Sequence, residues 1–189
     1  AVGYQSLYTN TTGASNLAMG YQSLYANTTG TWNTAIGFEA LKTNITTNNS
    51  TAVGYHALMT SVASDNTAFG TYALRLNTSG TTNTALGQSS LAANTTASNN
   101  TAVGHAALTA NTTGTRNVAV GSYALDATTT GGYNVSVGAY SLSTNTTASY
   151  NTAVGDQALY STTTGASNTG LGDNALLANT TGTQNVAVG

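Results

Sequence analysis

The sequence predicts an all-β fold, a parallel β-solenoid (β-roll) of 17-residue coils, and two regularities carry this prediction. The first is a glycine that returns at a fixed interval: ten of the eleven intervals are 17 residues long, and the other, from Gly54 to Gly70, is 16. The second is a leucine four residues after each glycine, from Leu7 to Leu176. A short, strict period is typical of a solenoid, in which each coil buries its apolar side chains only against its neighbours.

Positions are counted from this glycine as zero, and positions 14 to 16 read as a short strand. Position 14 is Thr or an apolar residue, position 15 is small, and position 16 is always apolar. This alternation places positions 14 and 16 on one face. We expect Leu at position four and the residue at position 16 to fill the interior. The expected strands are 17–19, 34–36, 51–53, 67–69, 84–86, 101–103, 118–120, 135–137, 152–154, 169–171 and 186–188.

The small residue at position 15 then points away from that interior. A row of small side chains lets another backbone approach closely. We therefore expect a subunit contact at this position, with Ala102, Ala119 and Ala153 as its representatives.

The remaining positions carry turn residues. Position 13 is Asn in ten of eleven coils, with Ser50 as the departure, and stacked copies predict an amide ladder. Position ten is Gly in seven coils, which favours a turn with positive φ. The short coil loses its residue in the turn between Leu58 and Asn66, where a deletion spares the strands.

Composition excludes several classes of protein. Only 4% of residues are charged and the net charge is −2, so no basic surface exists for nucleic acid. There is no cysteine for disulfides, no apolar run of the roughly 20 residues that a membrane helix needs, and no signal peptide. Because both ends lie inside the repeated phrase and neither carries a capping repeat, we expect residues 1–189 to be a single solenoid segment of a longer repetitive chain.

The size of each coil also predicts self-association. A coil offers about two core side chains, which bury too little apolar surface to offset the backbone entropy lost when its 17 residues are ordered. Packing against identical chains would close part of this gap. We expect an oligomer, most simply a trimer, or a filament.

No catalytic or metal-binding constellation stands out, so we expect a non-enzyme without a cofactor. Asp156 and Asp173 share position one in adjacent coils, and two solvated turn residues are the simpler interpretation of them. His56 and His105 lie on different coils without a third ligand, which argues against a metal site.

Two surface features suggest recognition. Aromatic residues occupy position one of four consecutive coils, and another precedes the Asn of position 13; they either stabilise the stack or contact a sugar or protein. These residues are Tyr4, Tyr21, Phe38, Tyr55 and Trp32. Acceptor motifs for N-glycosylation recur at position seven, where an exposed turn would form a row of glycans. These sites are Asn10, Asn27, Asn44, Asn77, Asn94, Asn111, Asn145 and Asn179.

The repeated phrase, Asn151-Thr152-Ala153-Val154-Gly155 followed by Ala158-Leu159, resembles the YadA-like head repeats of trimeric autotransporter adhesins. It is equally similar to repeats of phage tail-fibre-like and large secreted surface proteins. The resemblance implies a rigid extracellular or cell-surface rod for a filament or for attachment, with itself and a host-surface glycan or protein as partners. The alternative is a virion shaft that binds a receptor. An ice-binding solenoid, suggested by threonine rows at positions eight and 14, ranks below both.

Overall fold

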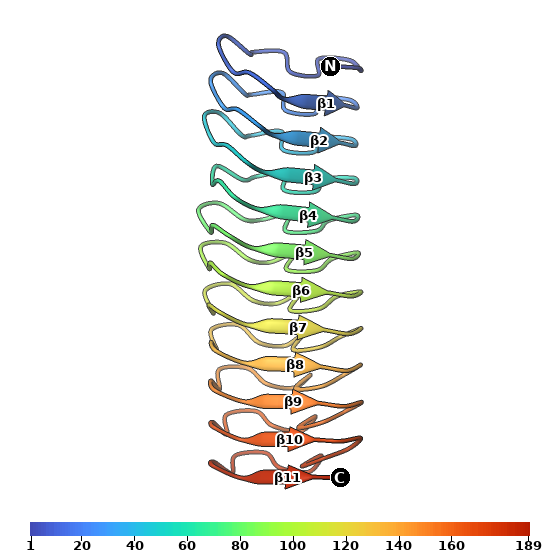
Figure 1. Ribbon diagram of the computed structural model, residues 1–189, viewed down its shortest axis with the longest axis vertical. Helices are drawn as coiled ribbons and strands as arrows, with labels where there is room; N and C mark the ends of the chain where they lie inside the picture. The colour runs from blue at the N-terminus through green and yellow to red at the C-terminus, as the bar shows by residue number, and fades with distance from the viewer.

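A computed structural model describes all of residues 1–189 as a parallel β-solenoid without helices (Figure 1). Each coil contributes one strand of three residues, and the eleven strands lie in chain order in one parallel sheet. The predicted fold class and strand positions are confirmed. The strands are β1 (Leu17–Met19), β2 (Thr34–Ile36), β3 (Thr51–Val53), β4 (Thr67–Phe69), β5 (Thr84–Leu86), β6 (Thr101–Val103), β7 (Val118–Val120), β8 (Val135–Val137), β9 (Thr152–Val154), β10 (Thr169–Leu171) and β11 (Val186–Val188).

Neighbouring strands pair residue for residue, so equal positions of successive coils lie side by side. Leu17 pairs with Thr34, one full period later. Across the short coil, Thr51 still pairs with Thr67, and the position-eight residue Val62 still donates its N–H to the carbonyl of Thr78. The missing residue is therefore position nine, and its loss leaves the sheet in register, as predicted.

Left-handed backbone shapes the corners of every coil. Positions two, four and 12 have φ between 49° and 63° although none of them is glycine. Such residues cost about 1–2 kcal/mol each, and bonds between coils offset this. The N–H of Gln22, at position two, donates to Tyr4 in the preceding coil, whereas the N–H of Leu24, at position four, donates to Ala40 in the following coil. The backbone N–H groups of the corner thus donate hydrogen bonds to both the preceding and the following coil.

The glycine at position zero is required by the approach of the next coil. Gly104 has φ 131°, and a Cβ there would lie 2.5 Å from the carbonyl oxygen of Gly121. No L side chain fits this space. The glycines of position ten differ, because none of them has positive φ, so the positive-φ turn expected there is wrong. A Cβ at Gly114 would instead meet the carbonyl oxygen of Gly131 in the next coil and, at 2.5 Å, the side-chain oxygen of Asn111.

The predicted leucine column is confirmed. Nine of its members, from Leu24 to Leu159, are fully buried in one continuous core, and Leu7 and Leu176 pack against this core at its two ends. The column runs the length of the rod because each leucine sits above its equivalent in the next coil. It is the main source of apolar burial in the structure.

The second core position differs from the prediction, because the strand faces the opposite way. Position 15 points inward and is buried in β1 to β10, whereas position 16 points outward, with Met19 41% and Phe69 56% exposed. Space explains the inversion. Where the strand carries Gly170, a Cβ would lie 3.3 Å from Leu159 Cγ and 3.0 Å from the carbonyl oxygen of Ala175. The interior beside the leucine column therefore admits little more than a methyl group.

Candidate interaction surfaces

The outward side of the sheet is a regular surface that runs the length of the rod, and we call positions 14 and 16 of β1–β11 the sheet face. Its position-14 column is mainly Thr, with Val or Leu elsewhere, and its position-16 column is entirely apolar. The exposed members of that second column include Met19, Phe69, Leu86, Val154 and Leu171. A contiguous exposed apolar surface of this kind usually marks an interaction site.

The predicted subunit contact at position 15 is wrong. Ala102, Ala119 and Ala153 are fully buried and belong to the same core cluster as the leucine column. Their side chains face the interior of their own coil. A second chain packing on this sheet would instead meet positions 14 and 16.

The predicted glycan row at position seven is also misplaced. Six of the eight residues, Asn27, Asn44, Asn77, Asn94, Asn111 and Asn145, are fully buried, and only Asn10 and Asn179 in the terminal coils are partly exposed. A sugar on any of the six would need space that the interior lacks. Position seven is part of the core.

The buried amides of position seven form a ladder along the rod. Asn94 Nδ2 donates to Asn77 Oδ1 at 2.8 Å and to the carbonyl of Ala97 at 3.0 Å. Asn111 repeats the pattern onto Asn94 at 3.0 Å. The ladder pauses at Thr128, which leaves Asn111 Oδ1 without a donor. Buried polar groups of this kind stabilise a fold only when they are paired, and here identical neighbours supply the partners.

The predicted amide ladder at position 13 is confirmed. The N–H of Asn100 donates to Asn83 Oδ1 at 3.0 Å, and the N–H of Asn117 donates to Asn100 Oδ1 at 2.9 Å. Each amide nitrogen donates to a position-ten carbonyl, as Asn100 does to Gly114 at 2.9 Å. Two internal amide ladders therefore run beside the leucine column.

The threonine rows divide into two kinds. At position eight, hydroxyls donate to the backbone of the next coil, as Thr95 does to Thr112 at 3.1 Å. At position 14, the threonines share the sheet face with bulky neighbours such as Phe69 and Leu86. Position eight lies outside the sheet. The two rows therefore do not make the flat threonine array that the ice-binding hypothesis requires.

The aromatic residues of position one form a continuous stack. Tyr4, Tyr21, Phe38 and Tyr55 follow one another with ring centroids 4.9–5.4 Å apart and nearly parallel planes. Each inner ring has both faces covered, so the column presents ring edges to solvent. Trp32 differs, because it is 66% exposed and no ring stacks on it. Of the five aromatic residues predicted to make contacts, Trp32 is the one whose ring face is not covered by another ring.

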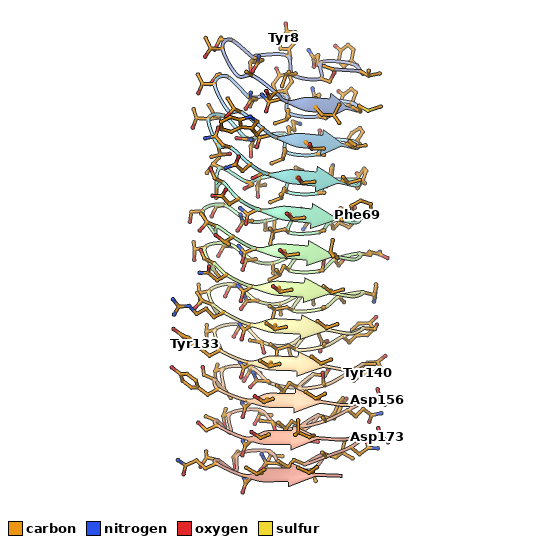
Figure 2. All side chains as sticks on the ribbon, in the orientation of Figure 1. Tyr8, Phe69, Tyr133, Tyr140, Asp156 and Asp173 are labelled. Atoms are coloured by element: carbon orange, nitrogen blue, oxygen red, sulfur yellow. The ribbon has the colours of Figure 1, made fainter.

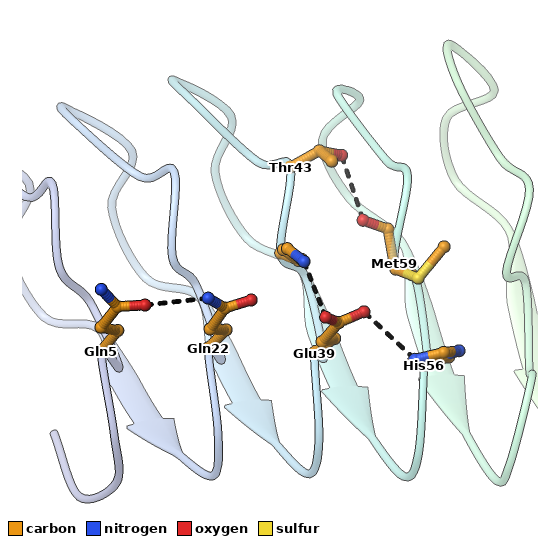
Figure 3. Close-up of polar contacts among 7 residues, drawn as sticks. Gln5, Gln22, Glu39, Thr43, His56 and Met59 are labelled. Carbon is orange, nitrogen blue, oxygen red and sulfur yellow. Dashed lines mark hydrogen bonds and ion pairs between the residues drawn. The ribbon is translucent and has the colours of Figure 1, made fainter.

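Polar side chains at position two also follow the register (Figure 3). Gln22 Nε2 donates to Gln5 Oε1 at 2.9 Å. One coil further on, Glu39 lies 2.7 Å from Lys42 Nζ and 3.1 Å from His56 Nε2. His56 thus lies in a turn, partly buried beside a carboxylate. The few charges of this region neutralise one another.

The two aspartates of position one lie on an exposed edge of the rod (Figure 2). Asp156 accepts a hydrogen bond from Gln157 at 3.3 Å, and Asp173 accepts one from Asn174 at 3.0 Å. No group of three His, Asp or Glu side chains is placed to hold a metal ion, and the structure contains no enclosed pocket or membrane-spanning helix. The candidate functional features that remain are therefore exposed surfaces of the rod.

The fold and its surfaces define a parallel β-solenoid with an exposed apolar sheet face. No family model, no curated protein and no solved structure matches the chain.

Proposed function

We propose that this chain is a segment of a structural rod in an extracellular fibre or adhesin, and that identical chains associate laterally through their sheet faces. The observation that carries the proposal is the constant register of eleven coils, which lines up every outward side chain in straight columns. A rod of this kind acts through its length and stiffness. Eleven strands at about 4.8 Å per step span roughly 50 Å.

Stiffness follows from the number of independent ladders that join one coil to the next. Hydrogen bonds join successive coils at the strands, at the left-handed corners, at the threonine row of position eight and in the two amide ladders. Bending the rod would strain all of them together. Further repeats would lengthen the rod without changing its section.

The sheet face supports lateral association because its apolar column lies in water when the chain is alone. Packing two such faces together would bury Phe69, Leu86 and their equivalents at about 25 cal/mol per Å². With only 4% charged residues, little electrostatic repulsion opposes the contact. The resemblance to YadA-like repeats favours a homotrimer as this assembly. The open face of Trp32 would then remain available for a glycan or protein on a host surface.

Sedimentation velocity of paired variants tests the proposal. Leu86→Lys combined with Val154→Lys places two charges on the sheet face, whereas Thr96→Lys combined with Thr164→Lys places the same charges on the exposed row of position nine. We expect the unmodified chain and the position-nine variant to sediment as oligomers, and the sheet-face variant as a monomer with an unchanged circular dichroism spectrum. A monomeric unmodified chain, or a sheet-face variant that still assembles, would refute lateral association through this face.

A further inference from the structure

The tyrosines of this chain are arranged in pairs. Of its eleven tyrosines, eight stack face to face on another tyrosine of the neighbouring coil. The ring centroids are 5.0–5.6 Å apart and the planes lie within 15° of parallel. The pairs are Tyr4 with Tyr21, Tyr8 with Tyr25, Tyr123 with Tyr140, and Tyr133 with Tyr150.

The other three tyrosines lack this arrangement. Tyr55 meets Tyr72 edge-on at 84°, because the two residues occupy different positions of their coils. Tyr160 has Ser143 and Leu177, not aromatic residues, at the same position of the two neighbouring coils. The parallel pairs arise wherever successive coils carry Tyr at the same position, so that the register of the solenoid brings the rings together.

The pair Tyr133 and Tyr150 is an accessible example away from the chain ends. The two rings lie 5.0 Å apart and are 43% and 61% exposed. Arg116 occupies the same position in the preceding coil, with its guanidinium carbon 5.2 Å from the centre of the Tyr133 ring, and its Nη1 contacts the Tyr133 hydroxyl. Tyr133 is therefore held between the arginine and Tyr150, at the edge of the rod (Figure 2).

We propose that these stacked pairs are sites of oxidative cross-linking, at which a haem peroxidase supplied with hydrogen peroxide joins the two rings as dityrosine. Each phenol gives up one electron and one proton, and the two phenoxyl radicals form a carbon–carbon bond between ring carbons ortho to oxygen. The hydrogens on those carbons move to the oxygens and restore both phenols. The pair loses two hydrogens in all, and one hydrogen peroxide is reduced to two waters.

The arrangement favours this coupling within the chain. Holding two reacting groups side by side converts an encounter between molecules into an intramolecular step, which raises its rate by orders of magnitude. The chain has no cysteine to form a disulfide or to intercept the radical as a thiol. The product would fasten adjacent coils covalently, in the way that disulfides fasten small secreted domains. This inference goes beyond the proposed rod function and does not depend on lateral association.

A test compares two variants that each keep only two tyrosines, with the other nine changed to Phe so that the ring stacks remain. One keeps Tyr133 and Tyr150, and its matched control keeps Tyr133 and Tyr160. Both are treated with peroxidase and hydrogen peroxide at low protein concentration, and the monomer fraction is analysed by dityrosine fluorescence and intact mass. We expect at least about tenfold more intrachain cross-link, with a loss of two hydrogens, in the stacked-pair variant.

Equal yields in the two variants, or a stacked-pair yield that is unchanged when the chain is unfolded in urea, would overturn the proposal. If circular dichroism shows that nine substitutions prevent folding, single substitutions in the otherwise native chain decide the question by peptide mapping. Tyr150→Phe should then abolish the cross-linked peptide that contains Tyr133, whereas Tyr160→Phe should leave it in place. Persistence of that cross-link in Tyr150→Phe would equally contradict the assignment.

Discussion

At the scale of single residues, volume decides which side chains face inward. The coil is so narrow that Leu at position four leaves room only for Ala, Ser or Gly at position 15, as at Ala119, Ser136 and Gly170. The leucine column was predictable because Leu never varies there. The inward face of the strand was not predictable, because alternation defines two faces without saying which one is buried. The larger apolar residues lie at position 16, which faces outward.

The leucine column should dominate the stability of the rod. Replacing Leu108 by Ala leaves a cavity between fully buried neighbours, and we expect a loss of about 2–5 kcal/mol in the free energy of unfolding. The matched control Leu76→Ala, on a side chain that is 37% exposed, should cost clearly less than Leu108→Ala. Urea denaturation followed by circular dichroism measures both. Similar losses in the two variants would contradict the proposed core.

One carboxylate should make stability depend on pH. Burial raises the pKa of Asp126 above its ordinary value of 3.8, although a 2.6 Å hydrogen bond from Ser143 Oγ partly offsets the effect. Because the folded state holds the proton more tightly than the unfolded state, the stability that this carboxyl contributes is fully present below pH 3.8 and is lost as the pH rises through the folded pKa. Neutral pH therefore carries the full cost of the buried charge.

Asp126→Asn removes that cost while keeping an oxygen that can accept from Ser143. We expect the variant to be more stable than the unmodified chain at neutral pH, and the difference to shrink as the pH approaches the ordinary value of the carboxyl group. Thermal melts across this pH range measure the difference. A variant that is less stable at neutral pH, or a difference that does not vary with pH, would show that burial does not set the pKa of Asp126.

At the scale of the coil, positions differ in how strongly the adjacent coils constrain them. Strand, corner and amide-ladder positions are fixed by their neighbours above and below, whereas position nine is exposed and the short coil does without it. The ladder at position 13 could be predicted because Asn recurs there between turn and strand. Position seven was misjudged, because Asn followed by Thr is ordinarily surface turn chemistry, and an amide is satisfied in the core only when the next coil offers its equivalent.

Deletions should expose this difference. Removing Thr113, at position nine, imitates the natural short coil and forfeits the hydrogen bond from its N–H to Thr129, so we expect a cost of about 0.5–1.5 kcal/mol. Removing Ala119 from β7 should shift the strand by one residue, turn Val120 toward the narrow interior and abolish cooperative unfolding. Thermal unfolding compares the two deletions. Equal damage would mean that the turn is as constrained as the strand.

At the scale of the whole molecule, the structure is a rod with a closely packed interior and an exposed apolar sheet face. Leucine and amide ladders satisfy the interior of each coil, while the apolar column of position 16 lies open along one side. Self-association is an expectation from composition and from the small core of each coil. The face proposed for it could not be predicted, because positions 14 and 16 were expected to face the interior.

Thiol labelling at three adjacent kinds of position tests this central claim most directly. Thr113→Cys lies at an exposed turn, Ala119→Cys lies inside, where Ser136 shows that a side chain of this size is accepted, and Val120→Cys lies on the sheet face. Each is labelled with a maleimide in the otherwise unmodified chain, which the proposal expects to assemble, and in the chain carrying Leu86→Lys and Val154→Lys.

We predict that Thr113→Cys reacts quickly in both chains and that Ala119→Cys is protected in both. Val120→Cys should be protected in the assembling chain and become reactive when the two lysines keep the chains apart. Rapid labelling of Ala119→Cys would contradict the inward strand face. Equal labelling of Val120→Cys with and without the lysines would contradict association through the sheet.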